Sequence, residues 1–278
     1  MTQHIVAADN PDLANAITER ILAGEPVEET PPPAPEPELM KAPSDGAVEL
    51  PCGFIDTEAD ELIREAEVRE LNGFDEEALS RASTPSQAVQ TLLERAVVRI
   101  GEKKPSRDSL DALLSGDVDA LVVGIYRATY GDTVDFRPTC PACNERVEVD
   151  VHLVNDVEVT SLTDASDRQF TVNLKRGSAE CRLPDWATQR EVSSHSESSE
   201  AEQTSVFLKN CVTSINGMPV LGLDTVRGLS IVDRRTLAEE ISERMVGPQM
   251  MSVHKPCPEC GDEIYLPVGL DALFQYGS

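Results

Sequence analysis

Two Cys-x-x-Cys pairs are the part of this sequence whose residue types and spacing could do chemistry. Cys140 and Cys143 form one pair, and Cys257 and Cys260 form the other. Each pair contains a proline and lies between two segments with strand-like patterning. Two such loops can present four thiolates at the corners of a tetrahedron, which is the geometry that Zn²⁺ accepts from sulfur. The spacing therefore predicts one structural zinc ion bound by these cysteines.

The residues around the pairs favour zinc over redox chemistry. Asn144 and Gly261 directly follow the pairs, and turns there let backbone N–H groups point at sulfur. A lone Cys-x-x-Cys could be a redox pair, but here there are two pairs and neither opens a helix after a strand. His254, three residues before Cys257, is an alternative ligand or a neighbour of the site. Since the pairs lie far apart, zinc would enclose residues 144–256 as an insertion.

No catalytic set accompanies the predicted zinc. Cys52, Cys181 and Cys211 have no partner at ligand spacing and are interpreted as buried apolar thiols. The sequence contains no Gly-rich phosphate loop, no Gly-x-Ser-x-Gly elbow and no His-Glu-x-x-His motif. A zinc ion closed by four thiolates also has no open position for water. We therefore expect neither an enzyme nor a small-molecule substrate.

The composition excludes further classes of partner. In 278 residues, 24 Lys and Arg stand against 50 Asp and Glu, which gives a net charge of −26 and a pI near 4.4. Such a polyanion repels nucleic acid and anionic membranes. No stretch approaches the roughly 20 apolar residues of a membrane span, and the N-terminus lacks the pattern of a secretion signal. We expect a cytoplasmic product with reduced or metal-bound cysteines. The ratio of 18 Arg to 6 Lys fits either a high-salt host or a GC-rich genome.

Two segments are predicted to precede the globular part. Residues 1–24 hold a short amphipathic helix whose apolar stripe is Leu13, Ile17 and Ile21. Residues 25–48 form a linker rich in Pro and Glu that cannot bury a core. A helix on an extended tether is typical of a docking peptide, so the stripe is a candidate partner-binding surface. The alternative is that the helix packs on its own domain.

The globular part is predicted to be α+β, with a change of period near residue 133. Residues 49–132 predict a helical subdomain, in which one helix begins at the Thr84 capping box and runs to Gly101. Residues 133–274 predict a small zinc-ribbon-like β unit, with an inserted α/β segment over about 154–252. We also expect a strand over 66–71, a helix over 117–130, strands over 169–174 and 179–183, and a helix within 229–245.

Several short blocks of the globular part occur in a specific order. They are 50–53 (LPCG), 67–77 (EVRELNGFDEE), 116–117 (GD), 127–132 (RATYGD), 140–143 (CPAC), 257–261 (CPECG) and 273–274 (LF). In this order, they resemble the baseplate hub and hub-assembly protein family of T-even-type phages, which has relatives in contractile injection systems. The resemblance covers about residues 50–274. It implies a non-enzymatic structural or assembly component that binds hub, spike or tape-measure proteins. It leaves open whether the particle is a phage or an injection system, and whether the protein stays in the mature particle.

The alternative function is a stand-alone zinc-ribbon protein–protein adaptor of the cytoplasm, for example in transcription or translation. Such an adaptor would usually carry a basic face for nucleic acid. Here basic residues adjoin only in pairs, at Lys103-Lys104, Lys175-Arg176 and Arg234-Arg235. The charge pattern therefore favours the assembly protein.

Overall fold

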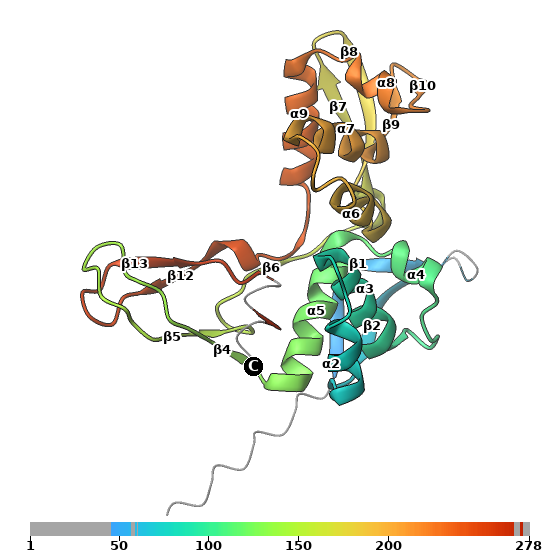
Figure 1. Cartoon of the computed structure of the whole chain (residues 1–278). Helices are drawn as coiled ribbons and strands as arrows, with labels where there is room; N and C mark the ends of the chain where they lie inside the picture. The colour runs from blue at the N-terminus through green and yellow to red at the C-terminus, as the bar shows by residue number, and fades with distance from the viewer. Residues whose placement is uncertain (1–45, 57–58, 60, 270–272, 275–278) are drawn as a thin grey trace, which may run out of the picture. The chain divides into compact units, whose positions relative to one another are not determined.

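The computed structural model describes residues 46–56, 59, 61–269 and 273–274 (Figure 1). All of them belong to one compact unit, Ala42–Ser278. They form helices and antiparallel sheets, which confirms the α+β class. The expected amphipathic helix with Leu13, Ile17 and Ile21 and nearly all of the expected linker lie outside the described residues. None of the described helices combines the length and apolar character needed to cross a membrane.

The described chain opens with an antiparallel sheet covered by helices. The sheet has the strand order β1-β2-β3, and its strands are Ala47–Asp56, Glu61–Val68 and Val97–Ile100. The helices of this region are α2 (Gly73–Leu79), α3 (Pro85–Ala96), α4 (Arg107–Asp111) and α5 (Ser115–Tyr130). Leu93, Leu121 and Ile125 have no exposed surface and belong to a large apolar cluster, the main core.

The structure corrects the prediction of a helical subdomain over 49–132. The helix that begins at Thr84 ends at Ala96 instead of continuing to Gly101, because Val97–Ile100 form strand β3. Apolar spacing over four residues cannot separate a helix from a strand. Val97 and Ile100 pair with β2 and are buried, and this pairing stabilises a strand here instead of a longer helix. The region therefore contains a sheet as well as helices, and the strand expected over 66–71 overlaps the end of β2.

A buried carboxylate ties three elements of this region together. Asp75 of α2 accepts hydrogen bonds from Arg69 Nη1 at 2.7 Å and Nη2 at 3.0 Å, and from Arg95 Nε at 2.6 Å. Arg69 directly follows β2, and Arg95 lies in α3. The Arg69 guanidinium, together with the Asn72 N–H and Arg95, holds the pKa of Asp75 well below its usual range. The ion pairs thus fix α2 against both neighbours.

Residues 169–245 form a separate lobe, here called the inserted lobe. Its antiparallel sheet has the order β10-β9-β8-β7, and Figure 1 shows α7 and α9 beside it. Its own apolar core includes Leu208, Leu237 and Ile241, none of which has exposed surface. The strands are β7 (Gln169–Leu174), β8 (Gly177–Arg182), β9 (Val212–Ile215) and β10 (Met218–Pro219), and the helices are α6 (Trp186–Ser193), α7 (Glu200–Cys211), α8 (Leu223–Arg227) and α9 (Ile231–Glu243).

The chain enters and leaves this lobe through neighbouring segments. Strand β6 (Val159–Thr160) pairs with β11 (Gly247–Pro248), and the 3₁₀ turns Ala165–Arg168 and Met250–Ser252 follow them. The outgoing segment crosses α5 at Gly116, where a Cβ atom would lie 1.9 Å from the Val246 carbonyl oxygen. Glycine at this position therefore allows the two backbones to touch.

A second buried carboxylate lies near this crossing. Asp117 Oδ1 accepts the N–H groups of Cys52 at 2.8 Å and Gly53 at 3.1 Å. Arg168 donates to the carbonyl groups of the same two residues. Burial raises the pKa of Asp117 to about 6 and that of the Cys52 thiol to about 12. Cys52 is therefore a buried, protonated thiol, as expected.

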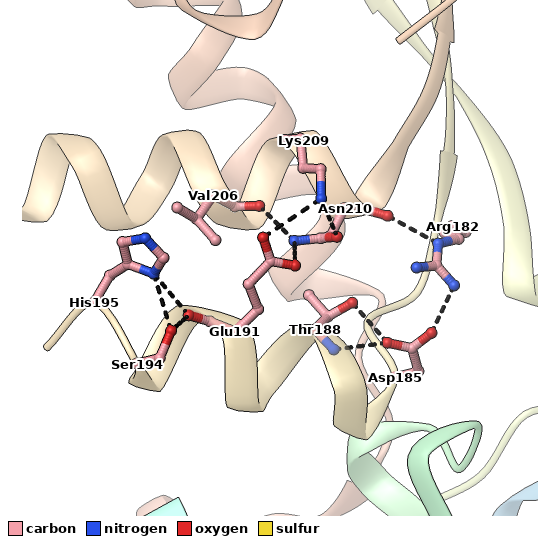
Figure 2. Close-up of polar contacts among 9 residues, drawn as sticks. All are labelled: Arg182, Asp185, Thr188, Glu191, Ser194, His195, Val206, Lys209 and Asn210. Atoms are coloured by element: carbon pink, nitrogen blue, oxygen red, sulfur yellow. Dashed lines mark hydrogen bonds and ion pairs between the residues drawn. The ribbon is translucent and has the colours of Figure 1, made fainter. Parts of the chain in front are cut away.

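Helix α6 has polar contacts on two sides. Toward the rest of the inserted lobe, Glu191 accepts from Asn210 Nδ2 at 3.0 Å and pairs with Lys209 at 3.4 Å (Figure 2). On the other side, Trp186 Nε1 donates to Gln90 of α3 at 2.6 Å. Figure 2 also shows the start of α6, where Asp185 accepts from Thr188 and pairs with Arg182. The helix thus joins the lobe to α3 through hydrogen bonds.

Candidate metal centre

Two β-hairpins carry the two Cys-x-x-Cys pairs, and we call them the knuckle hairpins. Strand β4 (Thr133–Phe136) pairs with β5 (Val149–His152), and β12 (Val253–Pro256) pairs with β13 (Glu263–Leu266). Each Cys pair lies in the loop between its two strands, as the sequence predicts. Figure 1 shows the hairpins side by side, although they are separated in sequence by the inserted lobe.

The two loops have the same backbone geometry. In each loop, the N–H of the first Cys donates to the carbonyl group of the residue five positions later. The carbonyl group of the same Cys accepts from the N–H of the residue four positions later. The bonds are Cys140 N to Glu145 O (2.9 Å), Asn144 N to Cys140 O (2.9 Å), Cys257 N to Asp262 O (2.7 Å) and Gly261 N to Cys257 O (2.8 Å). The residue after each pair is left-handed, with φ of 61° at Asn144 and 78° at Gly261. These are residue types that accept this conformation at low cost, so the local sequence explains the loop.

The four sulfur atoms converge on one point. The Sγ atoms of Cys140 and Cys260 are 3.7 Å apart, and those of Cys143 and Cys257 are 3.8 Å apart. All four lie within 4.8 Å of one another. A Zn–S bond of about 2.3 Å places tetrahedral sulfurs about 3.8 Å apart, whereas a disulfide needs about 2.0 Å. The cluster could therefore hold a metal ion, and all four residues are free thiols.

Local hydrogen bonds and neighbouring sulfurs set the protonation of the cluster. The backbone N–H groups of Cys143 and Ala142 donate to the Cys140 sulfur and lower its pKa to about 7. The N–H of Asp262 acts in the same direction on Cys260, but loss of hydration and the other three sulfurs raise the pKa of that thiol to about 12. A bound cation would lower the pKa of all four thiols, because it stabilises all four thiolates at once.

Burial differs along each pair. Cys140 and Cys257 are buried and belong to the main core, whereas Cys143 is partly exposed and Cys260 is exposed. His254 lies outside the cluster and faces Tyr265 across the hairpin, with 5.4 Å between the ring centroids.

One contact that also joins the two knuckle hairpins has no signal in the sequence. Lys255 Nζ of β12 pairs with Asp156 Oδ2 at 2.6 Å, and the same carboxylate oxygen accepts the His152 N–H of β5 at 2.7 Å. No local pattern could reveal it, because the partners lie on opposite sides of the inserted lobe in sequence. The ion pair lowers the pKa of Asp156 against the opposing effect of burial. The hairpins are thus linked by charge as well as by sulfur.

A family described as T4 bacteriophage base plate protein matches residues 64–275. The matched range contains both Cys pairs and the whole inserted lobe. No curated protein and no solved structure matches the chain.

Proposed function

Because the chain belongs to the family of T4 bacteriophage base plate proteins, we propose that it acts in the hub of the baseplate and binds hub, spike or tape-measure proteins there. The family match supports a structural role in a phage baseplate and suggests a non-enzymatic protein. It gives no support to a stand-alone adaptor. The net charge of −26 favours protein partners over nucleic acid in the assembling particle.

The test is recovery of partners from the native host. A tagged full-length chain should co-purify with hub, spike or tape-measure proteins, and deletion of its gene should leave tails without complete baseplates in electron micrographs. Intact particles in the deletion strain, with no tail protein recovered, would refute the hub role. If tail proteins are recovered, mass spectrometry of purified particles distinguishes a component of the mature baseplate from an assembly factor of the cytoplasm.

We propose further that Cys140, Cys143, Cys257 and Cys260 bind one Zn²⁺ in a structural role. The support is the all-sulfur donor set and the separations of 3.7 and 3.8 Å between sulfurs. This would make residues 133–274 a zinc-ribbon-like unit that encloses an insertion of about 154–252. Elemental analysis of protein purified without chelator should give about one zinc per chain, and less than about half would contradict the proposal.

The N-terminal segments are proposed as a second partner-binding device. Leu13, Ile17 and Ile21 would contact another protein of the particle, and residues 25–48 would act as the tether that keeps this weak contact at high local concentration. Changing the three apolar residues to Ser should reduce partner recovery without loss of zinc, whereas the matched change Glu19→Gln on the same segment should not. Equal recovery with both variants would contradict the docking role.

A further inference from the structure

A polar pocket of about 480 Å³ lies among α3, α4, α6 and the segment after α2. Its lining includes Arg81, Arg107 and Arg190 but a single carboxylate, Glu94. In the chain as a whole, acidic residues outnumber basic ones by 50 to 24, so this arginine pocket reverses the general charge balance. A local excess of guanidinium groups favours an anionic ligand.

Two of the three guanidinium groups, those of Arg81 and Arg107, are only weakly neutralised by the protein itself, whereas Arg190 is paired with Asp111. Arg107 has no ion pair among the described residues. Arg81 pairs with Glu77 at 3.5 Å, and both side chains are about two-thirds exposed or more, which makes the pair worth little. Arg190 donates to Asp111 through Nη2 at 2.5 Å, but its buried Nε has no partner within the part of the chain that the structure describes. The charges of Arg81 and Arg107 are therefore the ones left for a ligand.

Neutral groups of α3 complete the pocket. Gln87 Oε1 accepts from Ser83 N at 3.0 Å and Oγ at 2.8 Å, which leaves the Gln87 NH₂ group for a ligand. Gln87 and Ser86 lie in the first turn of α3, which contains no acidic residue to offset the positive end of the helix. The one carboxylate of the lining, Glu94, accepts from Gln90 Nε2 at 2.7 Å through Oε1 and keeps its negative charge, so the lining holds three arginines against one carboxylate.

We propose that the arginine pocket binds carboxylate side chains of an acidic segment of another protein. The pocket of about 480 Å³ has room for more than one carboxylate side chain, and Arg81 and Arg107 reach it from separate elements. The neighbouring amide and hydroxyl groups suit peptide carbonyl groups. The acidic chain around the pocket disfavours a continuous polyanion such as nucleic acid. The inference rests on the proposed function only in placing that segment in a protein of the same particle.

The experiment uses the full-length, metal-loaded protein and a fluorescein-labelled hexaglutamate peptide, with a hexaglutamine peptide as the neutral probe. Fluorescence anisotropy should show salt-sensitive binding of hexaglutamate alone. The double variant Arg81→Gln/Arg107→Gln should weaken it about tenfold, since two charge-assisted contacts are lost. The matched variant Arg176→Gln removes an exposed arginine of the β7–β8 turn and should leave binding within about twofold.

The proposal is overturned if hexaglutamate does not bind, if hexaglutamine binds equally well, or if Arg176→Gln weakens binding as much as the double variant. Displacement of the peptide by inorganic phosphate at the same anion concentration would also overturn it, because the pocket would then prefer a compact oxyanion. These results concern purified protein and a peptide, so they stand apart from the partner recovery and particle imaging that test the baseplate role.

Discussion

The knuckle hairpins and the inserted lobe show two different ways to hold a small antiparallel unit together. The inserted lobe buries its own apolar core around Leu208, Leu237 and Ile241. The knuckle hairpins have no apolar core of their own: one face of their strands, with Cys140 and Cys257, belongs to the main core, and their loop residues 141–142, 144–146 and 258–262 are exposed around the four sulfurs. A two-stranded hairpin is marginal in water without such help. The proposed ion would therefore stabilise the loops, whereas the lobe is stabilised by apolar burial.

The largest expected effect follows from removing one sulfur. Cys257→Ser should abolish metal binding and cost several kcal/mol, because structural zinc contributes about 10 kcal/mol in small domains. Hydrogen exchange should then become fast in β4, β5, β12 and β13 while α7 and α9 keep their protection. Cys181→Ala, which changes a buried thiol of the inserted lobe, is the control and should leave the metal content unchanged. Metal retained by the Cys257→Ser variant would contradict the expectation that the knuckle hairpins depend on this metal site while the inserted lobe does not.

The converse experiment removes an apolar side chain from the inserted lobe. Leu237 has no exposed surface, and Leu237→Ala should lower the stability of the lobe by about 2–5 kcal/mol through lost burial and a cavity. Chemical denaturation followed by hydrogen exchange should place the loss in α7, α9 and β7–β9. The metal content should stay at the wild-type value. Loss of metal together with the lobe would mean that the two regions are one cooperative unit.

A third mode of cohesion, buried charge, is tested in the sheet region. Asp75→Asn would leave Arg69 and Arg95 without their carboxylate and should cost about 3 kcal/mol of unfolding free energy. The matched change is Glu67→Gln, which breaks the half-exposed pair with Arg99 and should cost far less, because solvent screens that pair. Thermal or urea unfolding measures both, and equal costs would show that burial of Asp75 is not what matters.

The buried carboxylate Asp117 should give the protein a specific pH dependence. Its pKa is about 6 in the folded state against an unfolded value of 3.8. Stability from this group is complete below the unfolded pKa and is lost as pH rises through 6. We expect about 1 kcal/mol less stability at pH 7 than at pH 5 in the wild type relative to Asp117→Asn. Urea midpoints at both pH values give this difference, and parallel pH profiles for the two proteins would contradict it.

The smallest expected effect concerns the loop backbone. Gly261→Ala puts a Cβ on a residue with φ of 78° and should cost about 1 kcal/mol, without steric conflict because nothing lies within 4 Å. Gly73→Ala is the control, since Gly73 is helical and equally open. The cost at Gly261 should appear as weaker metal retention in a chelator titration. Equal retention by both variants would show that the loop does not need this conformation.

Features encoded by nearby residues could be predicted well. The Thr84 cap, the helix over 117–130, the strand over 169–174 and the helix within 229–245 correspond to α3, α5, β7 and α9. Each depends on contacts between residues a few positions apart, which periodicity records. Strand β3 was mistaken for helix because its apolar residues suit either structure, and pairing with β2 decided the outcome.

The sequence by itself determined the donor set of the candidate metal centre, because only Cys140, Cys143, Cys257 and Cys260 share the required residue type and spacing. It also determined the left-handed turn after each pair, through Asn144 and Gly261. The tertiary structure decided everything that joins distant segments. The approach of the two hairpins, the Lys255–Asp156 pair and the convergence of three arginines on one pocket are of this kind. Spacing along a chain records local geometry, whereas contacts between remote residues arise only when the burial of apolar surface brings whole elements together.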